Sequence, residues 1–129
     1  SAMTKSERII RSIIGAERTN IRALATAVDI TADVLFSQGV PMDEIAVSKD
    51  IYPIVANRIG KTFPTTARQI ERTSNLCIDA LDGPLMEQYI GRPLAFRPPP
   101  RALIIYLAFY LHFGEPFFKV IEREPVLLF

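Results

Sequence analysis

The sequence predicts an all-α fold, a compact bundle of about six helices, and three observations lead to it. Apolar residues recur at three- and four-residue spacing in several segments, which is the period of an amphipathic helix. Glycine and proline separate these segments, at places where they would end helices. No segment alternates apolar and polar residues in the way expected of a half-buried strand.

Length and composition predict one globular domain. The chain has 129 residues, of which 49% are hydrophobic and 22% are charged, so it can bury a core. The formal net charge is only +1, so no overall basic character argues for nucleic acid. Basic residues nevertheless exceed acidic ones by three in each of three segments, residues 1–28 (five against two), 58–75 (four against one) and 92–101 (three against none). A folded domain can bring these segments onto one face.

The N-terminal part predicts two helices. Residues 1–4 are expected to be a disordered start, with Ser1-Ala2 a remnant of cloning, and residues 5–129 a single domain. Thr4 and Glu7 fit a capping box, in which each side chain bonds the other residue's backbone N–H. The elements expected up to residue 49 are a short helix ended by Gly15, a second helix, and a helical turn in 41–49. The second helix is expected from Asn20 to about Val28; apolar spacing resumes at 34–36, which allows it to continue to Ser37, and Gly39-Val40-Pro41 ends it.

The middle of the chain predicts a short helix and a tight break. The helix covers 52–59, with Pro53 in its first turn, where the missing N–H costs nothing. Gly60 closes it. Residues 62–64 are expected to form the turn, with Phe63 inserted into the core between this helix and the next.

A longer amphipathic helix is expected at 66–81. Thr66 can cap it, with Gln69 completing a capping box. Its expected inward face is Ala67, Ile70, Ser74, Cys77, Ile78 and Leu81, and its outward face is Arg68, Glu71, Arg72, Asn75 and Asp79.

After the stop signal Asp82-Gly83-Pro84, the C-terminal part predicts a short helix over 85–90 and an extended, proline-rich loop over 92–101. A strongly apolar helix follows over 103–113. Residues 115–129 show no clear pattern, although their apolar residues suggest one more packed turn or helix.

The segment 52–81 has the layout of a helix-turn-helix, in which the second helix enters the DNA major groove. Arginine can bond guanine bidentately, asparagine can bond adenine, and glutamate can accept from cytosine. The expected base-reading residues are Arg68, Gln69, Glu71, Arg72 and Asn75. The expected phosphate contacts are Lys61, Thr65, Thr66, Arg97 and Arg101. Any amphipathic surface helix also exposes such residues, so a solvated helix face is the alternative.

Tyr52-Pro53, Ile54-Val55-Ala56, Phe63-Pro64-Thr65-Thr66-Ala67 and Ile70-Glu71-Arg72 carry a resemblance to a known family. They resemble the helix-turn-helix in the C-terminal effector domain of the master sporulation response regulator of spore-forming bacteria. The likeness extends over residues 5–113, and its specific part is 52–78.

This resemblance implies a six-helix effector domain that binds double-stranded DNA at a short promoter box and regulates transcription. Glu71 and Arg72 match the family's base-reading pair, whereas Gln69 replaces an arginine, Asn75 a histidine and Pro64 a polar residue. The resemblance therefore does not determine the base sequence of the DNA box. The implied partners are RNA polymerase and a second copy, as a homodimer or in tandem on DNA. The family's full-length members begin with a receiver domain, which this chain lacks, so it is expected to be an excised effector domain or a stand-alone relative.

The alternative function is a protein-interaction or self-association module that retains a helix-turn-helix scaffold. The near-neutral charge and the apolar tail 116–129 favour it. No nucleophile or acid–base constellation indicates an enzyme, and no cofactor, metal site or membrane partner is expected. Cys77 and His112 are expected to be structural. A single cysteine allows no internal disulfide, so a cytoplasmic setting is expected.

Overall fold

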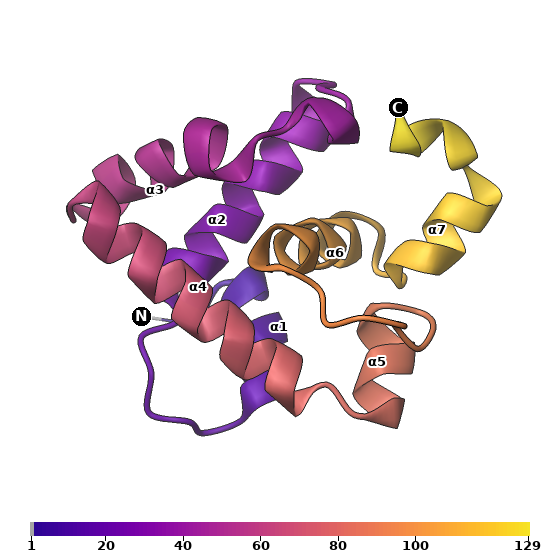
Figure 1. Cartoon of the computed structure of the whole chain (residues 1–129), viewed down its shortest axis with the longest axis horizontal. Helices are drawn as coiled ribbons and strands as arrows, with labels where there is room; N and C mark the ends of the chain where they lie inside the picture. The colour runs from indigo at the N-terminus through magenta and orange to yellow at the C-terminus, as the bar shows by residue number, and fades with distance from the viewer. Residues whose placement is uncertain (1) are drawn as a thin grey trace.

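The structure is a computed structural model that describes residues 2–129, and this range contains seven α-helices and no strand (Figure 1). The all-α prediction is therefore confirmed. The helices are α1 (Lys5–Ile14), α2 (Arg22–Ala32), α3 (Tyr52–Ile59), α4 (Phe63–Ala80), α5 (Gly83–Tyr89), α6 (Pro100–Phe113) and α7 (Phe117–Arg123). Two π-helical segments occupy Asp33–Ser37 and Val47–Ile51, and two 3-10 turns occupy Met42–Glu44 and Pro125–Leu128.

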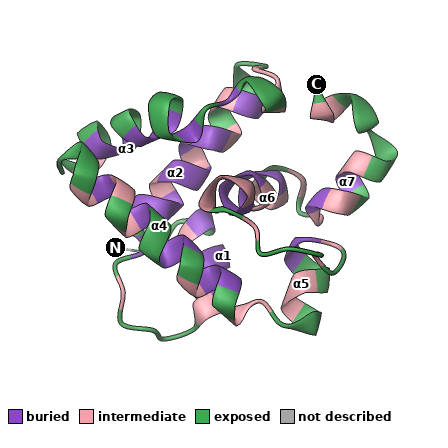
Figure 2. Ribbon diagram, viewed as in Figure 1, coloured by how far each residue is buried: buried purple, intermediate pink, exposed green. Residues whose placement is uncertain are grey.

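The apolar helix α6 lies at the centre of the bundle, with the other helices arranged around it (Figure 1). Its side chains Leu103, Ile104 and Leu107 are fully buried, because this helix is apolar on nearly all sides. α2 packs along it, and α4 crosses over α1, α2, α3 and α6. The bundle thus covers one face of α4, while the other face is exposed to solvent (Figure 2).

Several predicted helix ends are confirmed. The capping box at α1 is complete, with Glu7 N–H donating to Thr4 Oγ1 (3.2 Å) and Thr4 N–H donating to Glu7 Oε1 (2.8 Å). α3 has the predicted bounds, and Gly60 ends it in the left-handed conformation (φ 70°, ψ 36°), which glycine adopts without steric cost. Ser1 lies outside the described residues. Met3 and Thr4 are hydrogen-bonded to α1, through the Arg8 guanidinium and the Glu7 N–H.

The predicted start of α4 was wrong. The helix begins at Phe63 rather than Thr66, because Thr62 is its N-cap and accepts from Thr65 N–H (3.4 Å). Pro64 falls in the first turn of α4, where a helix tolerates proline. It is therefore part of the helix and not of the predicted turn before it. Phe63 at the first position leans outward and is 44% exposed, so it does not fill the core between α3 and α4.

The C-terminal segment is more ordered than its pattern indicated. α7 follows α6 after a short bend, and the turn Pro125–Leu128 places Leu127 against a cavity beside Phe36 and Phe109. α5 and α6 also begin earlier than predicted, at Gly83 and Pro100. Among the described residues, no single helix has the length and apolar composition to span a membrane; α6 and α7 meet those criteria only together, with a 69° bend between them.

Candidate nucleic-acid interface

The outer face of α4 gathers the side chains predicted to read DNA. Arg68, Glu71, Arg72 and Asn75 are all exposed. With a rise of about 1.5 Å per residue, Arg68 and Asn75 are about 10 Å apart along the helix axis. Figures 1 and 2 show that this helix crosses the front of the molecule with its exposed positions facing outward. The opposite face is buried as predicted, and its buried residues include Ile70, Ser74, Cys77 and Ile78.

Two arginines on this face have no side-chain partner among the described residues. Among residues 2–129, neither Arg68 nor Arg72 makes a side-chain hydrogen bond or an ion pair, and Lys61 in the α3–α4 turn makes none either. Their donors are directed to solvent. A guanidinium without an internal partner can bond an external acceptor without first breaking a contact. This part of α4 is therefore a basic surface available to an anion.

The N-terminus of α4 adds backbone donors to this surface. α4 is 18 residues long, and its positive end carries Lys61 and the half-buried Thr65. The Thr62 hydroxyl donates to Thr65 Oγ1 (3.1 Å) and also accepts from Thr65 N–H. These groups form a small polar cluster of the kind that contacts phosphate at helix N-termini.

The other end of the outer face is tied to the loop before α6. Arg97 Nη1 donates to Asp79 Oδ1 (2.6 Å), and Arg97 Nη2 donates to Asn75 Oδ1 (3.3 Å) and to the Asn75 carbonyl (3.5 Å). The predicted phosphate contact Arg97 is thus engaged by α4 itself. Both charged side chains remain more than half exposed, so a phosphate can compete for the guanidinium.

Three predicted site residues are buried, half-buried or engaged within the fold. Thr66 is fully buried, because the earlier start of α4 places it one turn into the helix, facing the core. Gln69 is half-buried, with its Oε1 enclosed and lacking a partner among the described residues. Arg101 donates to the carbonyls of Met42 (2.9 Å) and Ile45 (3.2 Å), so it braces a turn instead of contacting phosphate.

The predicted convergence of basic segments is only partly observed. In residues 1–28, the Arg11 guanidinium donates to the carbonyls of Gly15, Glu17 and Thr19, and Lys5 donates to the Leu111 carbonyl. These cations hold the fold together. The spacing of charges in the sequence could not reveal this role, because it depends on how the loop after α1 folds back against Arg11.

Burial controls the ionisation of two groups near α4. It raises the pKa of Tyr52 to about 12, with the neighbouring Glu71 carboxylate adding to the rise. Burial likewise raises the pKa of the Cys77 thiol to about 12, so the thiol stays protonated and unreactive at neutral pH.

His112 stacks on Phe36, with ring centroids 4.2 Å apart. Within residues 2–129, no group of three His, Cys, Asp or Glu side chains is placed to hold a metal ion.

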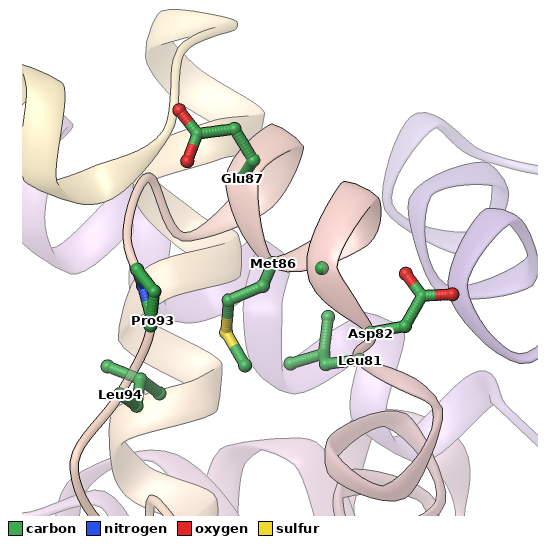
Figure 3. A pocket seen from close by; sticks show the side chains of 7 residues that line it. Leu81, Asp82, Met86, Glu87, Pro93 and Leu94 are labelled. Carbon is green, nitrogen blue, oxygen red and sulfur yellow. The ribbon is translucent and has the colours of Figure 1, made fainter.

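A small cavity of about 260 Å³ lies between α5 and the loop that follows it. Figure 3 shows Leu81, Met86 and Leu94 directed toward one another, while the carboxylates of Asp82 and Glu87 point away from them. An apolar site without convergent polar groups can receive an apolar side chain but offers no acid–base chemistry.

Comparison with known proteins gives no relative: no family model, no curated protein and no solved structure matches this chain.

Proposed function

We propose that the protein is a sequence-specific DNA-binding transcriptional regulator and that α4 enters the major groove. The observation that carries the proposal is the pair of exposed, unpartnered arginines, Arg68 and Arg72, one turn apart on a helix whose other face is buried. An arginine fork fits guanine O6 and N7, and an α-helix fits the major groove.

The connection between α3 and α4 supports this assignment. It consists of Gly60, Lys61 and Thr62, with glycine in the left-handed conformation, which is typical of a helix-turn-helix. The resemblance to the sporulation effector domain lies in the two helices that this connection joins, at residues 52–56, 63–67 and 70–72. In the proposed complex Arg72 and Glu71 read bases with help from Arg68 and Asn75, and Lys61 and Thr65 contact phosphate. The setting is cytoplasmic, and the activity is binding without catalysis.

The test begins by selecting a preferred duplex from a randomised pool. Fluorescence anisotropy then compares that duplex with a scrambled one at about 50 and about 200 mM salt, because base contacts retain discrimination as phosphate contacts weaken. We expect Arg72→Ala to lose about 1–3 kcal/mol, which is about 5- to 150-fold in affinity, and to relax the preference at one base pair.

Two further variants separate base reading from charge. Arg72→Lys keeps the charge but not the bidentate fork, so it should lose discrimination nearly as Arg72→Ala does. Lys119→Ala on α7 removes one exposed, unpaired cation away from α4 and should bind as wild type. Equal affinity of Arg72→Ala and wild type for the selected duplex would refute the role of Arg72.

A second candidate is a protein-interaction module, and one observation favours it. Phe96 is 87% exposed in the loop that also supplies Leu94 to the apolar cavity beside α5. An exposed aromatic side chain beside an apolar cavity is typical of a contact surface. Sedimentation velocity over a range of concentrations tests self-association, and a monomer at every concentration counts against it.

A further inference from the structure

The network of Arg97, Asp79 and Asn75 lies at the end of the proposed reading surface. One guanidinium binds three oxygen atoms that α4 supplies within four residues, at 2.6, 3.3 and 3.5 Å. Asn75 is one turn beyond Arg72, a rise of about 4.5 Å, so it would meet the next base pair along the groove.

The loop that carries Arg97 is stiff. Arg97 is followed by Pro98, Pro99 and Pro100, and a residue before proline is restricted to extended conformations. The proline rings also fix their own φ angles. Little backbone freedom is therefore lost when Arg97 binds α4, which favours a persistent contact even though the ion pair with Asp79 is exposed.

The chemistry of the contact fixes the orientation of the Asn75 amide. Arginine offers only donors, so the amide atom that faces Arg97 is the oxygen Oδ1. The amide nitrogen, with its two donors, then lies on the other side. Bidentate reading of adenine needs Oδ1 to accept from N6 while the nitrogen donates to N7. An amide oxygen has two lone pairs, so the bond from Arg97 disfavours this pairing through direction: it turns Oδ1 toward the loop and away from the base. Guanine presents two acceptors, O6 and N7, and no donor at this edge.

We propose that Arg97, anchored by Asp79, is a positioning residue that turns the Asn75 amide so that α4 presents donors to the base, which selects guanine at that position. This rests on the proposed DNA-binding function. Without Arg97 the amide is free to turn, and adenine becomes the better match.

The experiment measures base preference at one position. Competition anisotropy uses the selected duplex and its three single-base variants at each position, with wild type and each variant of the intact chain. The Asn75→Ala variant identifies the base-pair position that Asn75 reads, because the preference among the four bases falls at that position. At that position Arg97→Ala is expected to shift the preference from guanine toward adenine by about fivefold or more, with other positions unchanged. Asp79→Asn should shift it in the same direction, by less.

Two controls keep the result specific. Lys119→Ala removes a comparable exposed cation and should leave all preferences unchanged. The double variant Asn75→Ala/Arg97→Ala should match Asn75→Ala at the identified position, because Arg97 acts through Asn75. Arg97→Ala should melt within about 4 °C of wild type, since exposed ion pairs contribute little to stability.

Each other result overturns the inference. If Arg97→Ala weakens all four duplexes equally with the preference intact, Arg97 is only a phosphate contact. If Asn75→Ala alters no position, Asn75 does not read bases. If wild type shows no sequence preference at all, the proposed function fails first, and this is distinguishable because it is seen before any variant is compared.

Discussion

Two buried threonines on α4 are expected to respond in opposite directions to the same substitution. Thr66 and Thr73 are 0% and 1% exposed. The Thr73 hydroxyl donates to the Asn20 carbonyl (3.3 Å), which ties the loop after α1 to α4. The Thr66 hydroxyl has no hydrogen-bond partner among the described residues. Valine replaces only the hydroxyl with a methyl group, and it is β-branched like threonine, so helix propensity changes little.

The expected magnitudes follow from these environments. Burying a hydroxyl without a partner costs about 1–3 kcal/mol, so Thr66→Val should raise the free energy of unfolding by about 1 kcal/mol. Thr73→Val removes the hydrogen bond to the carbonyl of Asn20, so it should lower that free energy by about 1 kcal/mol. For 129 residues the unfolding entropy is about 0.27 kcal/mol/K, so each change moves Tm by about 4 °C and the variants differ by about 7 °C.

Thermal and urea unfolding followed by circular dichroism measure both variants beside wild type. The substitution is the same in each, so effects on the unfolded chain largely cancel in the comparison. Thr66→Val should also bind DNA as wild type does, because Thr66 lies in the core and not on the proposed interface. If Thr66→Val destabilises the protein as much as Thr73→Val, the Thr66 hydroxyl has a partner and the reasoning is refuted.

Three further outcomes are expected. Arg101→Leu should lower the free energy of unfolding by about 2 kcal/mol in urea titrations, because two backbone carbonyls lose a charged donor, and it should leave the salt dependence of DNA binding unchanged. Lys61→Ala should weaken binding to all duplexes evenly and reduce the slope of log K against log salt by about one. Burial raises the pKa values of Cys77 and Tyr52 to about 12, from reference values of 9.0 and 10.0, so the unfolded chain loses these protons first as pH rises. Tm should therefore fall between pH 9 and 12, and less steeply in Tyr52→Phe.

Local signals located most helices but not every boundary. α3 matches its predicted bounds because proline favours the first turn of a helix and glycine favours the position just past its end. The start of α4 was predicted with Thr66 as the cap, whereas Thr62 is the cap in the structure, and Pro64 fits either a turn or a first helical turn. Sequence spacing cannot choose between them. The choice depends on which threonine the core covers, and the core covers Thr66.

The candidate site was predictable where it depends on helix periodicity. Arg68, Glu71, Arg72 and Asn75 are exposed because the apolar residues opposite them bury the other face. Arg97 and Arg101 were not predictable in the same way, since both read as free cations in a loop. Their partners, Asp79 on α4 and the turn at Met42, are distant in sequence and were brought to them by the fold.

The net charge of +1 does not weigh against the proposed interface, because charge is arranged along α4. Lys61 lies just before α4, and Arg68 and Arg72 lie in its N-terminal half with Glu71 between them, whereas Asp79 and Asp82 lie at or just beyond its C-terminal end. Arg68 and Asp79 are about 16 Å apart along the axis, about twice the screening length of about 8 Å at physiological salt. DNA that meets the N-terminal half therefore experiences its cations and little of the acidic end. Discrimination between sequences would then depend on the base contacts of α4, because phosphate contacts carry no sequence information.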